Sequence, residues 1–283
     1  MATFTNRATL SYNGGTVDSN TVTGTFLETL SLTKTALSGT YAAGDVLTYA
    51  VALVNSGTAP LTGITVTDDL GAFAFGTGTV YPLAFVPGSI LLYVNGVLQP
   101  TPVPDQTQPL SVGGITVPAG GDAVLIYAAE VSAVAPLDVD GEITNTATAT
   151  GAGIPEPLSD SATVAAVAQP MLNITKALSP TSVAENGAIT YTFVIQNFGN
   201  TAAVATDNLQ VTDVFDPVLD ITTVTLDGTV LSQGTGYTYN AATGEFATVT
   251  SLITVPAATF MQQADGSVTV IPGESTLVVS GTI

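Results

Sequence analysis

Three residue types, His, Cys and Trp, are absent from this 283-residue chain. Without His and Cys there can be no Ser-His triad, thiol nucleophile, disulfide or ordinary zinc site. Basic residues are also scarce, because 3 Lys and Arg stand against 22 Asp and Glu, which gives a net charge of −19. Such a chain cannot neutralise phosphates, and an anionic membrane surface repels it. The composition therefore predicts no nucleic-acid partner, no cofactor and no enzyme with turnover.

Long apolar runs are missing as well. Although 46% of the residues are hydrophobic, Pro, Gly, Asn or Glu breaks every long apolar stretch, as in YPLAFVPGSILLYVNG. Membrane insertion is therefore not expected. The opening residues, MATFTNRATL, lack the apolar segment of a signal peptide. The high apolar content nevertheless predicts a folded chain rather than a disordered one.

The chain is rich in β-strand signals. Runs of Val, Thr, Ile, Tyr and Ala alternate in polarity between Gly, Asn, Asp and Pro, as in VLTYAVALVN, AITYTFVIQN and STLVVSGTI. No segment combines a helical period with helix caps. We therefore predict an all-β fold of Greek-key sandwiches, and the length suggests two domains of roughly 100–150 residues each.

An internal repeat defines the organisation of the chain. LSLTKTALSGTYAAGDVLTYAVALVNSGTAP recurs as LNITKALSPTSVAENGAITYTFVIQNFGNTA, so that Lys34 matches Lys176, 142 residues later. GITVTDDLG likewise matches LQVTDVFDP and pairs Asp68 with Asp213. The first copy then continues through a closing segment, DVDGEITNTATATG and SDSATVAAVAQP, that has no equivalent in the second copy before Ile283.

A copy of this closing segment lies at the other end of the chain. TFTNRATLSYNGG lines up with EITNTATATGAG, which matches Asn6 with Asn145, and further on Val22 matches Val164. We therefore predict three parts: a donor arm of one strand or a hairpin (1–28), a complete immunoglobulin-like domain (29–168) and a second such domain without its closing strands (169–283).

These motifs carry a family resemblance. The L-x-K-T start, the G-D-x-x-T-Y-x-V-x-x-x-N-S-G centre, the V-T-D strand and the T-N-T-A-T strand resemble the bacterial surface repeat catalogued as domain of unknown function eleven. That repeat is an immunoglobulin-like sandwich found in tandem on cell-surface proteins. The two-repeat size and the start of the chain also resemble clostridial endospore appendage subunits. The resemblance implies a location on the surface of a bacterial cell or spore.

Strand parity places one Lys, one Asp and one Asn toward each core: Lys34, Asp68 and Asn145 in the first domain, and Lys176, Asp213 and Asn6 in the second. Alternate residues of a strand share a face, and Lys34, Asp68 and Asn145 each share theirs with apolar neighbours. Burial lowers the pKa of a lysine and favours its nucleophilic amine, while a carboxyl group in an apolar site tends to hold its proton. Such an acid can hydrogen-bond the Asn carbonyl and shuttle protons to leaving ammonia. The resemblance implies this chemistry, because Gram-positive pilin and adhesin sandwiches join Lys to Asn with an Asp alongside.

Two alternatives to a Lys-Asn amide remain at the sequence level. The first is a buried Lys–Asp ion pair with a hydrogen-bonding Asn, which is costly but stable when well paired. The second is a one-residue error in strand register, which would turn each lysine toward solvent. The acidic residues Asp138, Asp140 and Glu142 match only a fragment of a calcium loop, so no metal site is expected.

The displaced segment suggests how the chain functions. A second domain without closing strands should expose an open edge and an apolar groove that accept a foreign strand. Because the first domain begins at Leu30, a short tether cannot carry the arm across a whole domain to its own groove. The arm should therefore enter another subunit, so that Asn6 meets Lys176 and Asp213 of its neighbour. A head-to-tail contact of this kind propagates as a filament.

The expected function is therefore a self-crosslinking extracellular fibre subunit. Lys34 and Asn145 would lock the first domain internally, with Asp68 as proton shuttle, and Asp213 would serve the same role between subunits. The expected partner is the homopolymer itself, with lateral contacts between protofilaments as an addition. The alternative is an adhesin module that binds a host or matrix ligand through loops such as 71–86.

Overall fold

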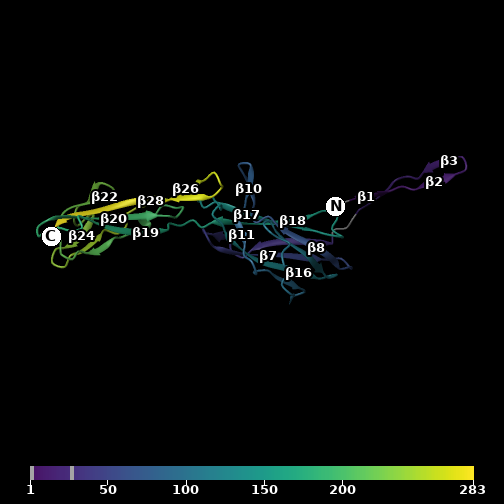
Figure 1. Ribbon diagram of the computed structural model, residues 1–283, viewed down its shortest axis with the longest axis horizontal. Coiled ribbons are helices and arrows are strands. Elements are labelled where there is room, and N and C mark those ends of the chain that lie inside the picture. Colours follow the sequence, from purple (N-terminus) through teal and green to yellow (C-terminus); the bar gives the residue numbers. More distant parts are fainter. Residues whose placement is uncertain (1–2, 26–28) are drawn as a thin grey trace. The chain divides into compact units, whose positions relative to one another are not determined.

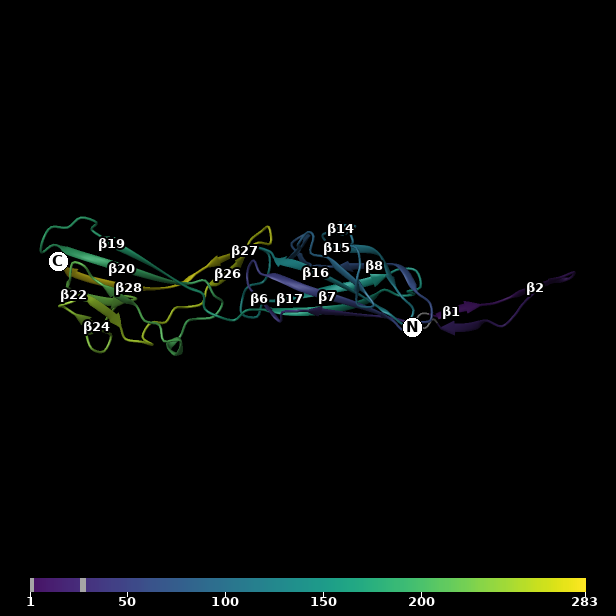
Figure 2. The same ribbon diagram turned by 90° about the horizontal axis from the view of Figure 1, so that it is seen from below.

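The protein is almost entirely β-structure in a computed structural model that describes residues 3–25 and 29–283 (Figures 1 and 2). The one helix in this part of the chain is a 3₁₀ turn, Ala205–Asp207. Within the described ranges, no helix has the length and apolar character needed to cross a membrane. The chain divides into two compact units, Met1–Pro136 with Gly141–Ala165 and Leu137–Asp140 with Ala166–Ile283. The predicted all-β sandwich fold is confirmed.

The N-terminal arm forms a ribbon of four short strands. Strand β1 (Thr3–Asn6) pairs with β4 (Val22–Thr25), and β2 (Thr9–Tyr12) pairs with β3 (Gly15–Asp18). Among the described residues, these strands pair with no other strand. Nearly all of their residues are exposed to solvent, including the apolar ones. An isolated two-stranded ribbon buries little apolar surface and is marginally stable by itself.

Two six-stranded sheets form the first unit. One follows the order β13 (Val97–Leu98), β12 (Leu91–Val94), β16 (Asp122–Val131), β7 (Val46–Asn55) and β5 (Leu30–Ala36), with β11 (Leu83–Phe85) also on β16. The other follows β14 (Gln106–Thr107), β15 (Leu110–Val117), β8 (Leu61–Asp68), β17 (Glu142–Thr150), β18 (Leu158–Ala166) and β6 (Thr40–Tyr41). A small hairpin joins β9 (Phe73–Phe75) to β10 (Gly78–Val80).

The core of the first unit lies where the buried faces of these sheets meet. Strand β7 shows the pattern clearly, because Leu47, Tyr49, Val51 and Leu53 are buried while the residues between them are partly exposed. This alternation follows from the two-residue repeat of an extended strand. The same rule turns residues of β8 and β17 toward β5 and β7, which positions the polar cluster described below.

The second unit has a five-stranded sheet and a much smaller partner sheet. The larger one follows β19 (Leu172–Ser179), β20 (Ala188–Asn197), β28 (Gly273–Thr282), β22 (Asp220–Leu226) and β23 (Thr229–Val230). The smaller one contains β21 (Thr212–Val214), β25 (Glu245–Thr248) and β24 (Tyr237–Asn240). A separate hairpin joins β26 (Thr259–Gln262) to β27 (Val268–Ile271). The core contains Phe193, Phe215 and Phe246 among its buried side chains.

The two units differ beside one strand. In the first unit β8 is flanked on both sides, by β15 and by β17, and β18 extends the sheet. Its counterpart β21 pairs with β25 through Asp213 and Phe246, as β8 pairs with β15 through Asp68 and Leu110. No strand of the described chain lies on the other side of β21. The second unit therefore has an open sheet edge where the first unit has β17 and β18.

Candidate functional site

A buried lysine lies at the centre of the first unit. Lys34, on the edge strand β5, points into the core, and its side chain is 0% exposed. Its ammonium group forms an ion pair with Asp68 of the facing sheet, whose side chain is 1% exposed. Burial lowers the pKa of Lys34, while the nearby Asp68 carboxylate opposes that shift. The side chains of Lys34 and Asp68 both face the core, as strand parity predicts.

A tyrosine hydroxyl joins this pair to Asn145. The Tyr127 hydroxyl donates to Oδ2 of Asp68 at 2.5 Å. It also accepts hydrogen bonds from Nζ of Lys34 at 3.1 Å and from Nδ2 of Asn145 at 3.1 Å. Burial, with the neighbouring Asp68, raises the pKa of Tyr127 well above its ordinary value. The phenol is therefore neutral and can act as both donor and acceptor.

Sequence reasoning missed Tyr127, although a signal for it existed. Tyr127 alternates with buried Leu125 and Ala129 on β16, so parity alone places it on the core face. Tyr49 and Tyr191 occupy the same position in the two repeats. Tyr127 pairs with Tyr49 as Val279 pairs with Tyr191, so Val279 is the counterpart of Tyr127. A comparison of the two repeats at this position would have revealed the difference.

The carbonyl end of Asn145 has a separate environment. Asn145 is 0% exposed, and its Oδ1 has no hydrogen-bond partner in the described part of the chain. The buried hydroxyl of Tyr49 interacts with the Asn145 side chain, and burial raises the pKa of this tyrosine. Tyr49 stacks on Tyr127 at 5.7 Å between ring centroids, and Lys34 Nζ lies 4.9 Å from the Tyr49 ring centroid. A buried amide thus lies in an aromatic environment, and its Nδ2 shares the Tyr127 hydroxyl with the Lys34 amine.

The closing strands also contact the backbone of Lys34. Its amide N–H donates to Oδ2 of Asp160 on β18 at 2.7 Å. This bond ties the edge strand β5 of one sheet to the edge region of the other. Strands β17 and β18 therefore supply Asn145, cover the lysine and fasten the strand that carries it.

The second unit repeats only half of this site. Lys176 forms an ion pair with Asp213, but the two side chains are 40% and 17% exposed. Lys176 Nζ lies 4.6 Å from the ring centroid of Tyr191 and 5.4 Å from that of Phe193. Asn6, the predicted partner, lies exposed on β1 of the arm, opposite Val22 of β4. The structure thus brings together Lys34, Asp68 and Asn145, and it pairs Lys176 with Asp213.

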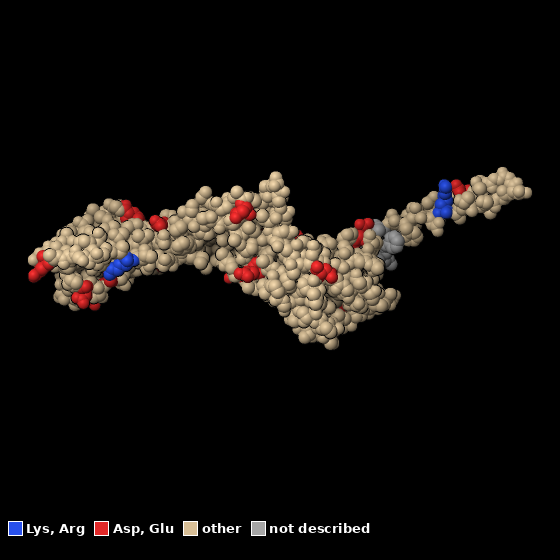
Figure 3. Space-filling model, viewed as in Figure 1, with Lys and Arg blue, Asp and Glu red and all other residues tan. Residues whose placement is uncertain are grey.

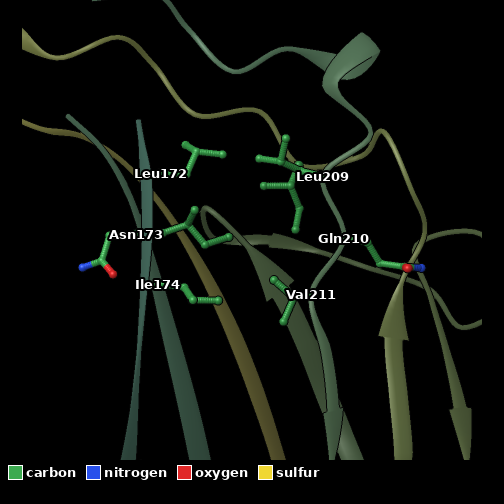
Figure 4. A pocket seen from close by; sticks show the side chains of 8 residues that line it. Leu172, Asn173, Ile174, Leu209, Gln210 and Val211 are labelled. Carbon is green, nitrogen blue, oxygen red and sulfur yellow. The ribbon is translucent and has the colours of Figure 1, made fainter. Parts of the chain in front are cut away.

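An apolar groove lies beside β19 of the same unit. Its lining consists of Leu172, Asn173, Ile174, Ile195, Leu209, Gln210, Val211 and Ile253. In Figure 4, Leu172 and Ile174 point from β19 toward Leu209 and Val211, whereas Asn173 points away. Leu172 is 43% exposed, although its counterpart Leu30 in the first unit is only 6% exposed. The same strand position is therefore buried in the first unit and open to solvent in the second.

Charge and metal chemistry add little to these sites. Charged side chains are sparse on the visible face of the molecule, and most of that face is neither acidic nor basic (Figure 3). Within the described residues, no group of three or more acidic side chains is arranged to hold a metal ion. The groups at the first site are therefore an amine, a carboxyl group, a phenol and an amide, and those at the second site are an amine and a carboxyl group.

Comparison with known proteins gives only distant similarities. No family model and no curated protein matches the sequence. Among solved structures, the pilus backbone protein RrgB of Streptococcus pneumoniae is 13% identical, and the match covers 86% of this chain and 55% of that one, with a TM-score of 0.36. The match spans about half of that RrgB chain and 40% of the full-length RrgB structure.

Two further matches are as distant or more distant. BcpA, the major pilin subunit of Bacillus cereus, is 13% identical over 96% of this chain and 73% of that one, with a TM-score of 0.35. The collagen-binding subdomain of the Enterococcus faecalis surface protein ACE is 6% identical over 50% of this chain and 99% of that one, with a TM-score of 0.30. At these values the matches assign neither a family nor a function to this chain.

Proposed function

We propose that this chain is a structural subunit of an extracellular bacterial fibre on a cell or spore surface. In this proposal the arm of residues 1–28 enters the open groove of the second unit of a neighbouring subunit, and head-to-tail repetition builds the filament. One observation carries the proposal: β17 and β18, which close the sheet on one side of β8 in the first unit, have no counterpart beside β21 in the described chain, and the arm carries their sequence.

Exposure of the arm supports this assignment. Ile143 and Val164, in the closing strands of the first unit, are each 1% exposed. Their counterparts in the arm, Phe4 and Val22, are 49% and 57% exposed. Burying such side chains in an apolar groove contributes roughly 1.5–3 kcal/mol for each large residue. The arm and the groove therefore each present surface that the other can cover.

The arm must change its internal register when it docks in this way. Asn6 is opposite Val22 in the arm, whereas alignment with Ile143 and Val164 would place Phe4 opposite Val22. The difference is a slide of two residues. A two-residue slide keeps each side chain on its original face, because the side-chain period of a strand is two.

Crosslinking completes the proposed assembly. The Lys34 amine would attack Cγ of Asn145, a C–N bond would form, and Nδ2 would leave as ammonia. Asp68 would serve as proton shuttle. In the same way Lys176 would join Asn6 of the neighbouring subunit, with Asp213 as shuttle. Folding and docking hold the reacting groups together, which replaces the entropy cost of a bimolecular reaction. No cofactor, metal or other enzyme is required.

The second candidate function, an adhesin module, has weaker support. Ligand binding through the loop of residues 71–86 needs neither an exposed arm nor an open groove. Donation of the arm uses both features.

Denaturing electrophoresis tests the assembly. Wild-type filaments should survive boiling in SDS as a ladder of multimers. Lys176→Ala and Asn6→Ala should each still form filaments by electron microscopy, because backbone pairing and apolar contacts remain. Those filaments should fall to monomers in hot SDS. Asp213→Ala should behave in the same way, since its lysine and asparagine would meet without a proton shuttle.

A mixture of the two variants provides the matched control. An Asn6→Ala subunit keeps a competent groove, and a Lys176→Ala subunit keeps a competent arm. Their mixture should therefore give an SDS-resistant dimer and no longer species. A longer ladder would place the intersubunit bond on other residues and would contradict this assignment.

A further inference from the structure

We infer that Tyr127 is a catalytic proton relay for the internal crosslink, carrying a proton between Asp68 and the leaving nitrogen of Asn145. The inference rests on the proposed function, because it names a further residue for the same reaction. Tyr127 hydrogen-bonds to each of the three residues involved, at 2.5 Å from Asp68 and 3.1 Å from both Lys34 and Asn145.

In the described chain, Asp68 is connected to the Asn145 amide through the Tyr127 hydroxyl. Its Oδ1 accepts the backbone N–H of Leu70 at 3.1 Å, and its Oδ2 faces Lys34 and Tyr127. In the described chain, no hydrogen bond joins Asp68 directly to either end of the Asn145 amide. The Tyr127 hydroxyl is therefore the link between the acid and the nitrogen that must leave.

The reaction balances through this link. Lys34 first transfers one proton to Asp68, which leaves a neutral amine and a neutral acid. The amine then attacks Cγ of Asn145, and as the C–N bond to Nδ2 breaks, Tyr127 gives its hydroxyl proton to that nitrogen. Asp68 restores the proton to Tyr127, and the attacking nitrogen returns one to Asp68. The net products are a Lys-Asn amide and one ammonia, and Tyr127 ends unchanged.

The second unit provides an internal contrast. Val279 occupies the position of Tyr127 opposite Tyr191, so the same strand of the second unit supplies no hydroxyl there. The Lys-Asp pair is present at both sites, which means that an ion pair by itself does not require the tyrosine. Tyr127 thus occurs in the first unit, whose own strand β17 supplies the asparagine.

A time course of ammonia loss tests the relay. Full-length chain carrying Lys176→Ala, which prevents the proposed intersubunit bond, is made by cell-free translation and sampled by intact mass after denaturation. Adding Tyr127→Phe should slow the loss of one ammonia at least tenfold, since acid-base groups commonly supply ~10²–10⁴ in rate. The control is Tyr41→Phe, which removes another buried hydroxyl, one bonded to the Pro136 carbonyl. It should leave the rate unchanged.

Two outcomes separate the relay from the crosslink itself. If the chain with Tyr127 intact loses no ammonia, the internal crosslink is absent and the relay is overturned with it, whereas assembly by strand donation is decided separately by deletion of residues 1–28. If that chain reacts and Tyr127→Phe reacts at the same rate, the relay is overturned while the crosslink stands.

A second substitution covers the case in which Tyr127→Phe does not fold. Placing 3-fluorotyrosine at position 127 keeps the ring and hydroxyl but makes the hydroxyl more acidic. If Tyr127 relays the proton, this substitution should change the rate of ammonia loss at least about threefold. The same substitution at position 41 should leave that rate unchanged. Equal rates at both positions would overturn the relay.

Discussion

The same lysine position has two environments in this chain. Lys34 and Lys176 each pair with an aspartate and lie near aromatic rings, yet their side chains are 0% and 40% exposed. The difference comes from β17 and β18, which cover Lys34 and have no counterpart over Lys176 in the described chain. Removing water lowers the pKa of an amine, so cover of this kind prepares a lysine to act as a nucleophile.

At the residue scale, we predict that Lys34 and Asn145 are joined in the purified protein. Intact mass of the denatured, monomeric Lys176→Ala chain should be lower than the sequence mass by one ammonia. Adding Lys34→Ala should abolish the loss because the nucleophile is gone, and adding Asp68→Ala should abolish it because the proton shuttle is gone. An unshifted mass in the Lys176→Ala chain would leave only the buried ion pair.

The open edge of β21 is the principal feature at the element scale. An edge strand with unpaired backbone groups accepts another strand, and proteins normally cover such edges. Here the groove beside it is lined by exposed Leu172 and Ile174, while the arm exposes Leu10 and Val22. The open edge with its groove, and the arm, therefore each have backbone groups that a docked partner would pair and apolar side chains that it would cover.

Deleting residues 1–28 should accordingly leave monomers that cannot elongate, because the groove then has no strand to accept. Light scattering and electron microscopy of the purified protein measure this. A synthetic peptide of residues 2–27 added to these monomers should bind the groove and form an SDS-resistant adduct, whereas the same peptide with Asn6→Ala should bind without one. Normal polymerisation of the truncated chain would rule out strand donation.

At the scale of the whole molecule, the two units should differ in stability because only the first is closed by its own strands. A bond from Lys34 to Asn145 would enclose a loop of roughly 110 residues. Cross-linking a loop of about 100 residues stabilises a fold by about 4–5 kcal/mol through the entropy of the unfolded chain. The internal bond should therefore act on the first unit and not on the second.

Calorimetry can detect this selectivity. In a Lys176→Ala chain, adding Asn145→Ala should lower the unfolding temperature of the first unit by about 10–15 °C, given that stability loss. The transition of the second unit should not move. Equal shifts of both transitions would indicate a general loss of folding rather than loss of one internal bond.

The sequence alone determined the fold class and the inward side chains of the first unit. Alternation of polarity is local information, since the two-residue period of a strand fixes which side chains face a core. That period was enough to place Lys34, Asp68 and Asn145 in one core. The repeat likewise matched each with a second copy, because repeated segments fold by the same local rules.

Only the tertiary structure decided which groups touch and which lie uncovered. Tyr127 comes from a strand far from Lys34 and Asp68 in sequence, and its bonds to these two residues and to Asn145 depend on how two sheets face each other. The exposure of Lys176 depends likewise on which strands lie beside it in space. Periodicity assigns a face to a residue, but the partner across that face follows from packing between distant segments.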